Sequence, residues 1–443
     1  MNRAMKDSGI PWIGEIPEGW EIARFNHRFK TYKGLSFTKA DLVEDGNPVI
    51  SYGQIHAKYN NGTSIDSKLI RFVPDGIIEN GGNSMVSLGD FIFADTSEDI
   101  DGCGNCVYID KDIELYAGYH SVIAQSILSK NNKYYAYLFL TNCWRSQIRM
   151  RVSGIKVFSI TQNILNQTLL IVPPVSEQEA IAAFLDSKCG EVDEMVSLQE
   201  QVIEELKAYK QSVITEAVTK GLNPSAPMKP SNIDWIGQIP THWEILRLKQ
   251  IVQVPLQYGA NESGVLFDEK LPRYVRITDI FNNTLKEDIV KLSLTEEQAA
   301  PYILNDGDIL FARSGGTVGK TFIYRNKYGR CAFAGYLIKA NIADEHCAQY
   351  IYYYTLSFCY DEWKNQVFIQ STIQNIGADK YSVLPITVPP LQEQREIADY
   401  LGRKCADIDA LIALKQQKIE ELKQYKKSLI YEYVTGKKQV FPS

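Results

Sequence analysis

The sequence contains one long segment twice, and this duplication constrains the fold more than any other feature. The segment SGIPWIGEIPEGWEIAR at residues 8–24 returns as SNIDWIGQIPTHWEILR at residues 231–247, an offset of 223. A second pair, VPPVSEQEAIAAFLDSKC at residues 172–189 and VPPLQEQREIADYLGRKC at residues 388–405, is offset by 216. The shrinking offset indicates one tandem duplication followed by a few deletions. Because the period is far too long for a solenoid, we expect two similar domains that meet two similar ligands at once.

Composition narrows the class of protein. The chain has 443 residues, 45% of them apolar, and this length predicts about three domains. No apolar stretch is long enough to span a membrane and no signal segment opens the chain, so we expect a cytoplasmic protein. Cys103 and Cys106 form one CxxC pair, but no second pair or nearby histidine completes a zinc set, so no metal site is expected. The cysteines that recur at matching positions, and are expected to be buried, are Cys143 with Cys359 and Cys189 with Cys405.

Each copy has the same order, a mixed domain followed by a long helix. Short alternating apolar stretches predict strands in the domains, and aromatic-rich stretches at residues 134–144 and 350–363 predict helices, so the domains are expected to be α+β. A run of turn-forming residues separates the copies. The expected boundaries are 1–173 and 231–389 for the domains, 174–220 and 390–437 for the helices, and 221–230 for the linker.

The two helical segments carry apolar residues in steps of three and four, the spacing of a coiled-coil seam. Ser176, three residues before Glu179, fits a capping box at the start of the first helix. About 35 residues of helix rise roughly 50 Å. The predicted seam residues are Val192, Met195, Val202, Leu206, Tyr209 and Val213 in the first helix and Ile408, Leu411, Leu422, Tyr425 and Leu429 in the second.

Charge favours the two helices as each other's partners. Residues 175–219 hold ten acidic and three basic side chains, whereas residues 391–437 hold eight acidic and nine basic ones. The alternative, that each helix packs on its own domain, stays open because heptads alone do not name a partner. The net charge of −6 argues against a strongly basic nucleic-acid binder but leaves room for local basic faces. The expected contacts join Lys415 and Lys418 to Glu200, Glu204 or Glu205.

A glycine-rich loop at residues 314–320 follows a predicted strand, and Arg313 and Lys320 bracket it, so its backbone N–H groups can approach a phosphate. The equivalent loop of the first copy, residues 95–99, is acidic. A shared frame with different loops would let two domains read different bases, because arginine favours guanine and carboxylates favour cytosine. The candidate DNA contacts are Arg145, Arg149, Arg151 and Lys156 in the first copy and Arg273, Arg276, Arg313, Ser314, Thr317, Lys320, Arg325 and Lys327 in the second.

A polar turn precedes each Val-Pro-Pro sequence, at residues 153–163 and 370–375. Its amide side chains Gln162 and Gln374 are further candidates, since glutamine and asparagine pair with adenine in a major groove. Ordinary turn chemistry is the alternative explanation for these residues.

Enzyme classes find little support. The loop at residues 314–321 resembles a nucleotide-binding P-loop, but serine stands where the first glycine is required. No Asn/Asp-Pro-Pro-aromatic sequence of an adenine methyltransferase is present, and the five histidines are dispersed. We therefore nominate no catalytic residue and expect no enzyme.

With these features the chain resembles the specificity subunit of type I restriction–modification systems. The resemblance rests on the doubled WIGxIPxxW and VPPxxEQ sequences, the latter followed each time by a long helix ending in ELKxYKxS, and it covers almost the whole chain. It implies two α+β target-recognition domains held apart by two long helices packed as an antiparallel coiled coil, with pseudo-twofold symmetry. Each domain would read one half of a bipartite asymmetric DNA target.

The resemblance also implies a non-catalytic role within a larger enzyme. Two methyltransferase subunits would dock on this chain and restriction (motor) subunits would join them, bringing S-adenosylmethionine, ATP and Mg²⁺. The helices would act as a ruler, so adding or deleting one turn within residues 192–213 would change the spacer between half-sites. The main alternative is a paired-domain scaffold that binds protein and not DNA, for which the acidic charge is the support.

Overall fold

The computed structural model describes residues 3–79, 81–128, 131–154, 156–281, 284–369 and 375–440. It divides into two compact units, the first formed by Met1–Gln199 with Gln417–Ser443 and the second by Glu200–Gln416. This division differs from the expected linear one, because neither long helix is a body of its own. Each helix gives one end to each unit, where it packs against a domain core.

The domain of the first unit contains two four-stranded sheets. All neighbouring strands run antiparallel except β5 and β11, which are parallel. The strand order in the first sheet is β10 (Cys106–Tyr108), β8 (Phe91–Ala94), β12 (Ser121–Ser126) and β4 (Phe29–Lys33). The strand order in the second sheet is β6 (Arg71–Val73), β5 (Asn47–Ile50), β11 (Leu115–Ala117) and β7 (Met85–Val86).

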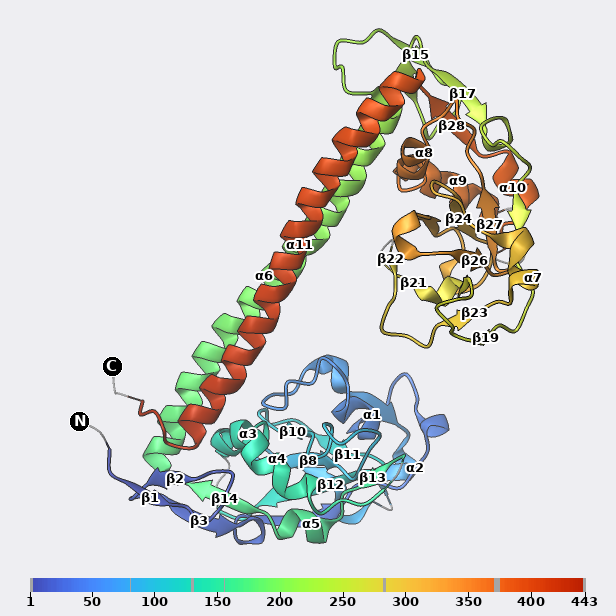
Figure 1. The fold of residues 1–443 in the computed structure, drawn as a ribbon. Coiled ribbons are helices and arrows are strands. Elements are labelled where there is room, and N and C mark those ends of the chain that lie inside the picture. The colour runs from blue at the N-terminus through green and yellow to red at the C-terminus, as the bar shows by residue number, and fades with distance from the viewer. Residues whose placement is uncertain are drawn as a thin grey trace. The chain divides into compact units, whose positions relative to one another are not determined.

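Two short helices, α3 (Lys133–Phe139) and α4 (Asn142–Arg149), lie beside the first of these sheets (Figure 1). An aromatic core joins them to it. Phe91 and Phe93 are two residues apart on β8, so their side chains point to the same face of the sheet. Their ring centroids lie 4.9 and 5.3 Å from that of Phe139. The same Phe139 ring lies 4.3 Å from Trp144 of α4. Such aromatic pairs add to the hydrophobic gain of burial, so α4 is held firmly on the sheet.

The second unit repeats this architecture. Ala94 of β8 pairs with Ser121 in the first domain, and Ala312 pairs with Leu337 at the corresponding place in the second. The sheets contain β18 (Gln257–Tyr258), β27 (Leu337–Ala340), β24 (Ile309–Ala312) and β25 (Thr321–Ile323), then β19 (Val265–Leu266), β23 (Leu292–Ser293), β20 (Arg273–Val275) and β26 (Cys331–Phe333). The helices are α7 (Glu296–Ala299), α8 (Ala348–Tyr354), α9 (Phe358–Ile369) and α10 (Ala378–Ser382).

Smaller elements complete both units. The expected linker is partly ordered, because its last three residues form β15 (Met228–Pro230), which pairs with β16 (Gln238–Pro240). The smaller elements of the first unit are β1 (Met5–Asp7), β2 (Glu15–Pro17), β3 (Glu21–Arg24), α1 (Tyr52–Ile55), α2 (Asp75–Ile78), β9 (Thr96–Ser97), β13 (Phe158–Ser159), α5 (Gln162–Asn166) and β14 (Leu169–Val172). The others of the second unit are β17 (Glu244–Arg247), β21 (Ile280–Phe281), β22 (Thr284–Leu285) and β28 (Pro385–Val388).

The two long helices are α6 (Val175–Lys220) and α11 (Leu391–Val434), with 46 and 44 residues. They exceed the stretch of about 35 residues used for the length of the rod, because their ends continue into the domain cores. Ile181 and Leu185 of α6 lie in the core of the first domain, while Ile214 and Val218 lie in that of the second. The helix begins at Val175, so Ser176 is inside it and the predicted capping box is wrong.

The helices run antiparallel in each unit (Figure 1). Lys426 of α11 bonds to Asp193 of α6 at 2.6 Å in the first unit, and Lys210 of α6 bonds to Asp409 of α11 at 2.6 Å in the second. The pairs predicted for Lys415 and Lys418 are not among the contacts of the described residues. Glu204 instead pairs with Lys207 and Lys418 with Glu421, each on its own helix.

The buried seam is shifted from the predicted one. Of the predicted residues, Val192, Leu206, Ile408 and Leu422 lie on it, whereas Val202, Val213 and Leu429 lie one position to its side. Met195, Tyr209, Leu411 and Tyr425 were predicted wrongly, since they are 47–55% exposed. The buried and half-buried seam residues are Leu185, Cys189, Val192, Val196, Gln199, Ile203, Leu206, Lys210 and Ile214 on α6 and Leu401, Cys405, Ile408, Ile412, Lys415, Ile419, Leu422, Lys426 and Ile430 on α11.

The shift leaves an exposed apolar stripe on the helices, which we call the outer stripe. Adjacent apolar residues, such as Met195 with Val196, made two seams possible, and the packing of antiparallel helices selects the other one. The stripe residues occupy equivalent positions of the two copies and are 47–59% exposed. They are Met195, Leu198 and Tyr425 in the first unit and Tyr209, Leu411 and Leu414 in the second.

The doubled sequence motifs join each domain to its helix. Trp20 donates its indole N–H to Glu177 at 3.1 Å, and Arg3 pairs with the same carboxylate at 2.8 Å. In the second copy His242 contacts Glu393 at 2.8 Å. The two motifs are therefore explained by packing. Across the described residues, no helix is long and apolar enough to cross a bilayer.

Candidate nucleic-acid interface

The structure brings together two segments that the sequence presented separately, the loop after β8 or β24 and the polar turn before Val-Pro-Pro. In the first domain β9 pairs with β13, and the Ile160 N–H donates to the Asp95 carbonyl at 2.7 Å. In the second domain Ser314 forms a bridge with Asn375, and the Ile376 N–H donates to the Arg313 carbonyl at 2.9 Å. Both domains thus build one polar surface at the same place in the frame.

In the first domain this surface is hollowed, with a volume of about 600 Å³. On the edge strand of the first domain, Lys33 pairs with Val122 of β12. On the edge strand of the second domain, Tyr258 pairs with Ile338 of β27. Lys33 and Tyr258 therefore occupy the same place in the two domains. We call this surface the recognition hollow in both domains, after its hollowed form in the first. It is formed by Lys33, Asp95, Ser159, Thr161, Gln162, Asn163 and Asn166 in the first domain, and corresponds to Tyr258, Arg313, Ser314 and Asn375 in the second.

The two recognition hollows carry opposite chemistry at matching positions. Asp95 in the first domain stands where Arg313 stands in the second, and Lys33 stands where Tyr258 does. The Arg313 guanidinium lies over the Tyr258 ring, 5.0 Å from its centroid, which fixes its orientation by a cation–π contact. His120 lies 3.3 Å from the Asp95 carboxylate. The frame is shared, but the groups presented to a ligand differ.

Sequence reasoning missed Lys33 and Tyr258. A usable signal was present, because each is followed by a glycine, Gly34 or Gly259, that the fold requires. A Cβ at Gly34 would lie 2.2 Å from the Gly118 carbonyl oxygen, and one at Gly259 would lie 2.3 Å from that of Ala334. The paired glycines mark the same edge-strand end in both copies.

The glycine-rich loop itself joins two strands. It contains only the short 3₁₀ turn Gly315–Thr317 between β24 and β25, so it lacks the strand-to-helix context of a nucleotide-binding P-loop. Thr317 is half-buried in this turn, and the Lys320 side chain is exposed after it. The loop can present backbone and cationic groups, but not in the form that binds a nucleoside triphosphate in NTPases.

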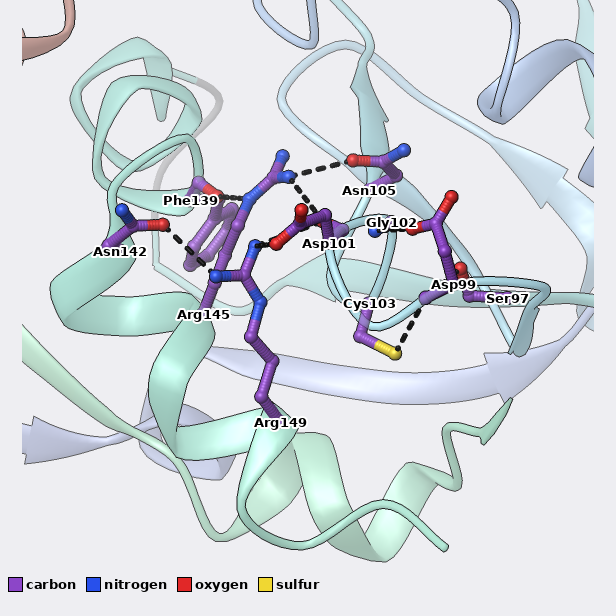
Figure 2. Close-up of polar contacts among 10 residues, drawn as sticks. All are labelled: Ser97, Asp99, Asp101, Gly102, Cys103, Asn105, Phe139, Asn142, Arg145 and Arg149. Atoms are coloured by element: carbon purple, nitrogen blue, oxygen red, sulfur yellow. Dashed lines mark hydrogen bonds and ion pairs between the residues drawn. The ribbon is translucent and has the colours of Figure 1, made fainter. Parts of the chain in front are cut away.

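Figure 2 shows Arg145 and Arg149 on one face of α4, where both hold the acidic loop that contains Asp101. Arg145 donates from Nε to the Phe139 carbonyl at 2.8 Å and from Nη1 to Asn105 Oδ1 at 2.8 Å. Arg149 donates from Nη2 to the Asp101 carbonyl at 3.0 Å and lies 3.5 Å from its carboxylate. Burial lowers the pKa of Arg145. These residues build the domain as well as carrying charge.

The remaining first-domain candidates follow α4 in the sequence. Gln162 opens α5 and lines the recognition hollow, half-buried. Lys156 is exposed before β13, and exposed Arg151 bonds to the Gln147 carbonyl at 2.6 Å. Only Gln162 of the five predicted residues in this domain therefore lies in the hollow.

Several second-domain candidates serve the domain interior. Arg273 is 6% exposed and pairs with Glu287 at 2.9 Å, so it cannot reach a DNA groove. Arg276 is held by Asp279 at 2.9 Å and by the Val290 carbonyl, and Arg325 pairs with Asp306 at 2.9 Å. The expectation that they add free positive charge is wrong, because each is neutralised by a carboxylate near it in the fold. Exposed Lys327 lies over the Tyr328 ring, and Gln374 falls outside the described residues.

Seven of the eight cysteines are buried free thiols, and Cys347 is half-buried. Cys143, Cys359, Cys189 and Cys405 are buried as the sequence predicted. Burial raises the pKa of Cys106 to about 12, so it is no nucleophile at neutral pH. Within the described part of the chain no cluster of three or more potential metal ligands occurs.

The fold and the two recognition hollows define a duplicated two-domain protein whose matched surfaces present different chemistry. The family described as "Type I restriction modification DNA specificity domain" matches residues 17–208 and 240–424. The chain is 23% identical to the EcoKI specificity subunit of Escherichia coli K12, over 90% of this chain and 84% of the relative. It is also 23% identical to the MjaVIII specificity subunit of Methanocaldococcus jannaschii, over 96% and 94%.

One solved chain, from a structure described as showing complex assembly of the type I R-M system, has the same fold. Its TM-score is 0.69 at 18% identity, and the match covers 95% of this chain and 98% of that one. Because the family match spans most of the sequence, the protein belongs to the type I restriction–modification specificity family. Its role is to provide DNA sequence specificity through two recognition domains.

Proposed function

We propose that this chain reads a bipartite, asymmetric DNA target, one half with each recognition hollow. The observation that supports this proposal is the contrast at one position of a shared frame, Asp95 in the first domain and Arg313 in the second. An arginine pairs with guanine through O6 and N7, whereas a carboxylate accepts from the cytosine amino group. Gln162 and Asn163 add amide groups suited to adenine. Two hollows with different donors and acceptors would read different half-sites.

The two long helices would set the distance between the half-sites. A helix of 46 residues rises roughly 70 Å, and the seam runs along both helices through either unit. Sites on one face of a duplex recur about every 34–36 Å. Helix length can therefore fix how many base pairs separate the two halves.

Two methyltransferase subunits would dock on the outer stripe. The stripe occurs once in each unit, with Met195, Leu198 and Tyr425 repeated as Leu411, Leu414 and Tyr209. Exposed apolar groups in such an arrangement are typical of protein contact surfaces. Restriction subunits would join these partners in the cytoplasm, and S-adenosylmethionine, ATP and Mg²⁺ would bind to the partners. This chain would supply no catalytic group.

Salt dependence separates this function from that of a protein-only scaffold. The complex with its methyltransferase subunit should shift a DNA duplex, and the affinity should fall steeply as salt rises, with a log–log slope of about −0.9 per phosphate contacted. A scaffold without a DNA role would show no duplex binding at low salt, which would contradict the proposal. Replacing Tyr209 or Tyr425 by glutamate should release the methyltransferase subunit and leave the chain folded, because both rings are about half exposed.

A further inference from the structure

A cleft of about 970 Å³ opens in the first unit between α4 and the last third of α11. It lies beside the arginines of Figure 2, away from the residues that form the recognition hollow. Leu140, Ile430 and Tyr431 provide apolar lining. The charged side chains that line it are Arg145, Arg149, Lys423, Lys426 and Lys427 with Asp101, Asp193 and Glu420.

The carboxylates in this cleft are already neutralised. Their partners are Arg149 for Asp101 at 3.5 Å, Lys426 for Asp193 at 2.6 Å and Lys423 for Glu420 at 3.5 Å. Two cations are left, one on each wall. Arg145 of α4 bonds only to carbonyl and amide oxygens, and exposed Lys427 of α11 has no hydrogen bond or ion pair with any described residue.

In the second copy, the residues at the positions equivalent to Arg145 and Lys427 bond directly to each other. The residues that correspond to Arg145 and Lys427 are Asp361 and Gln211, at the offset of 216. Gln211 donates from Nε2 to Asp361 Oδ2 at 2.5 Å, so the domain and the helix are joined directly. In the first copy two like charges replace this bonded pair. They cannot bond to each other, and an anion between them would restore the link.

We propose that this cleft binds a phosphate group between Arg145 and Lys427. The Nη2 group of Arg145 makes no hydrogen bond to the described residues and can donate to a phosphate oxygen, while Lys427 supplies the opposing charge. The partly buried setting strengthens such a contact. The phosphate comes from the DNA backbone or from a free nucleotide. In its DNA form the inference rests on the proposed function.

Lys427→Gln tests the site in the full-length chain, because it installs the residue of the second copy and removes an exposed side chain without bonds. Lys418→Gln is the matched control, with the same charge change at an exposed position of α11 outside the cleft. Both variants should melt like the parent. Binding is measured with a random-sequence duplex over a range of salt and, separately, with inorganic pyrophosphate.

If the phosphate is that of DNA, Lys427→Gln lowers the log–log salt slope by about 0.9, and Lys418→Gln does not. If the phosphate belongs to a free nucleotide, Lys427→Gln lowers the affinity for pyrophosphate about tenfold and leaves the salt slope of duplex binding unchanged. Either result supports the site. The proposal is overturned if both variants match the parent with both probes. If the parent chain does not bind duplex, that result counts against the proposed function alone. The pyrophosphate measurement still tests whether the cleft binds a phosphate group.

Discussion

Tyr134 of the first domain donates its hydroxyl proton to the carbonyl oxygen of Val434, the last residue of α11, at 2.8 Å. The two residues are 300 positions apart in the sequence. The second copy repeats the contact, with Tyr350 donating to the Val218 carbonyl at 3.2 Å near the end of α6. Each domain core therefore contains the end of the helix that belongs to the other copy.

The Tyr134 contact should stabilise the first unit more than its counterpart stabilises the second. Tyr134→Phe leaves a buried carbonyl without that donor and should lower the free energy of unfolding by about 1–2 kcal/mol. Tyr350→Phe is the matched control, because the Val218 carbonyl also accepts from the Thr387 hydroxyl. Urea unfolding followed by tryptophan fluorescence compares them. A larger loss for Tyr350→Phe would contradict this assignment.

Acid should weaken the joint between the first domain and α6. Burial opposes ionisation of Glu177, but hydrogen bonds from Arg3 and Trp20 outweigh burial and lower its pKa from the ordinary 4.5. A carboxyl group whose pKa is lower in the folded state stabilises the fold above its unfolded pKa, and this stabilisation is lost as pH falls through the folded value. Melting temperature should therefore decline below about pH 4.5 more steeply in the parent than in Glu177→Gln.

The control for the acid experiment is Glu179→Gln, which removes an exposed carboxyl group two residues away. This variant should keep the pH profile of the parent. If Glu177→Gln also kept it, the Arg3 and Trp20 contacts would not stabilise the charged form.

The position of the seam can be tested with neighbouring residues. Ile203 is 6% exposed on the observed seam, whereas Val202 on the predicted seam is half-buried. Ile203→Ala should cost about 2–4 kcal/mol of unfolding free energy and Val202→Ala less than about 1 kcal/mol. Thermal or urea unfolding measures both, and the reverse order would restore the predicted seam.

Arg313 should decide base preference in one half-site. Arg313→Ala should reduce discrimination at one base pair by about 1–3 kcal/mol and leave the other half-site unchanged. Competition binding with duplexes that vary one position at a time measures this effect. Arg325→Ala is the control, since its partner is Asp306. Unchanged discrimination in Arg313→Ala would remove Arg313 from the recognition hollow.

The repeat was the most informative part of the sequence. Motifs such as Trp20 with Glu177 recur because they join domain to helix, so they revealed the duplication and the two long helices. Periodicity alone did not choose between adjacent apolar residues such as Val202 and Ile203, because either produces three- and four-residue steps. The choice depends on the partner helix, whose antiparallel register no local pattern encodes.

Site residues were harder to predict, because charge in the sequence does not indicate what a side chain meets in the fold. Arg273 and Arg325 look available until the structure shows Glu287 and Asp306 beside them. Arg313 differs because an aromatic ring, and not a carboxylate, lies against it. That ring belongs to an edge strand 55 residues earlier in the sequence, and only the sheet brings the two together.

The central claim is that two differing domains read two half-sites at a separation fixed by the helices. One measurement tests it directly: the methylated adenines are mapped after co-expression with the methyltransferase subunit. A second map uses a variant with seven residues added to each helix between its interhelical ion pairs, within 194–209 and 410–425. Seven residues preserve the seam and add about 10 Å, or roughly three base pairs. We expect a split, asymmetric motif whose gap lengthens while both halves stay unchanged. An uninterrupted motif, or a gap that does not respond to the insertion, would contradict the account.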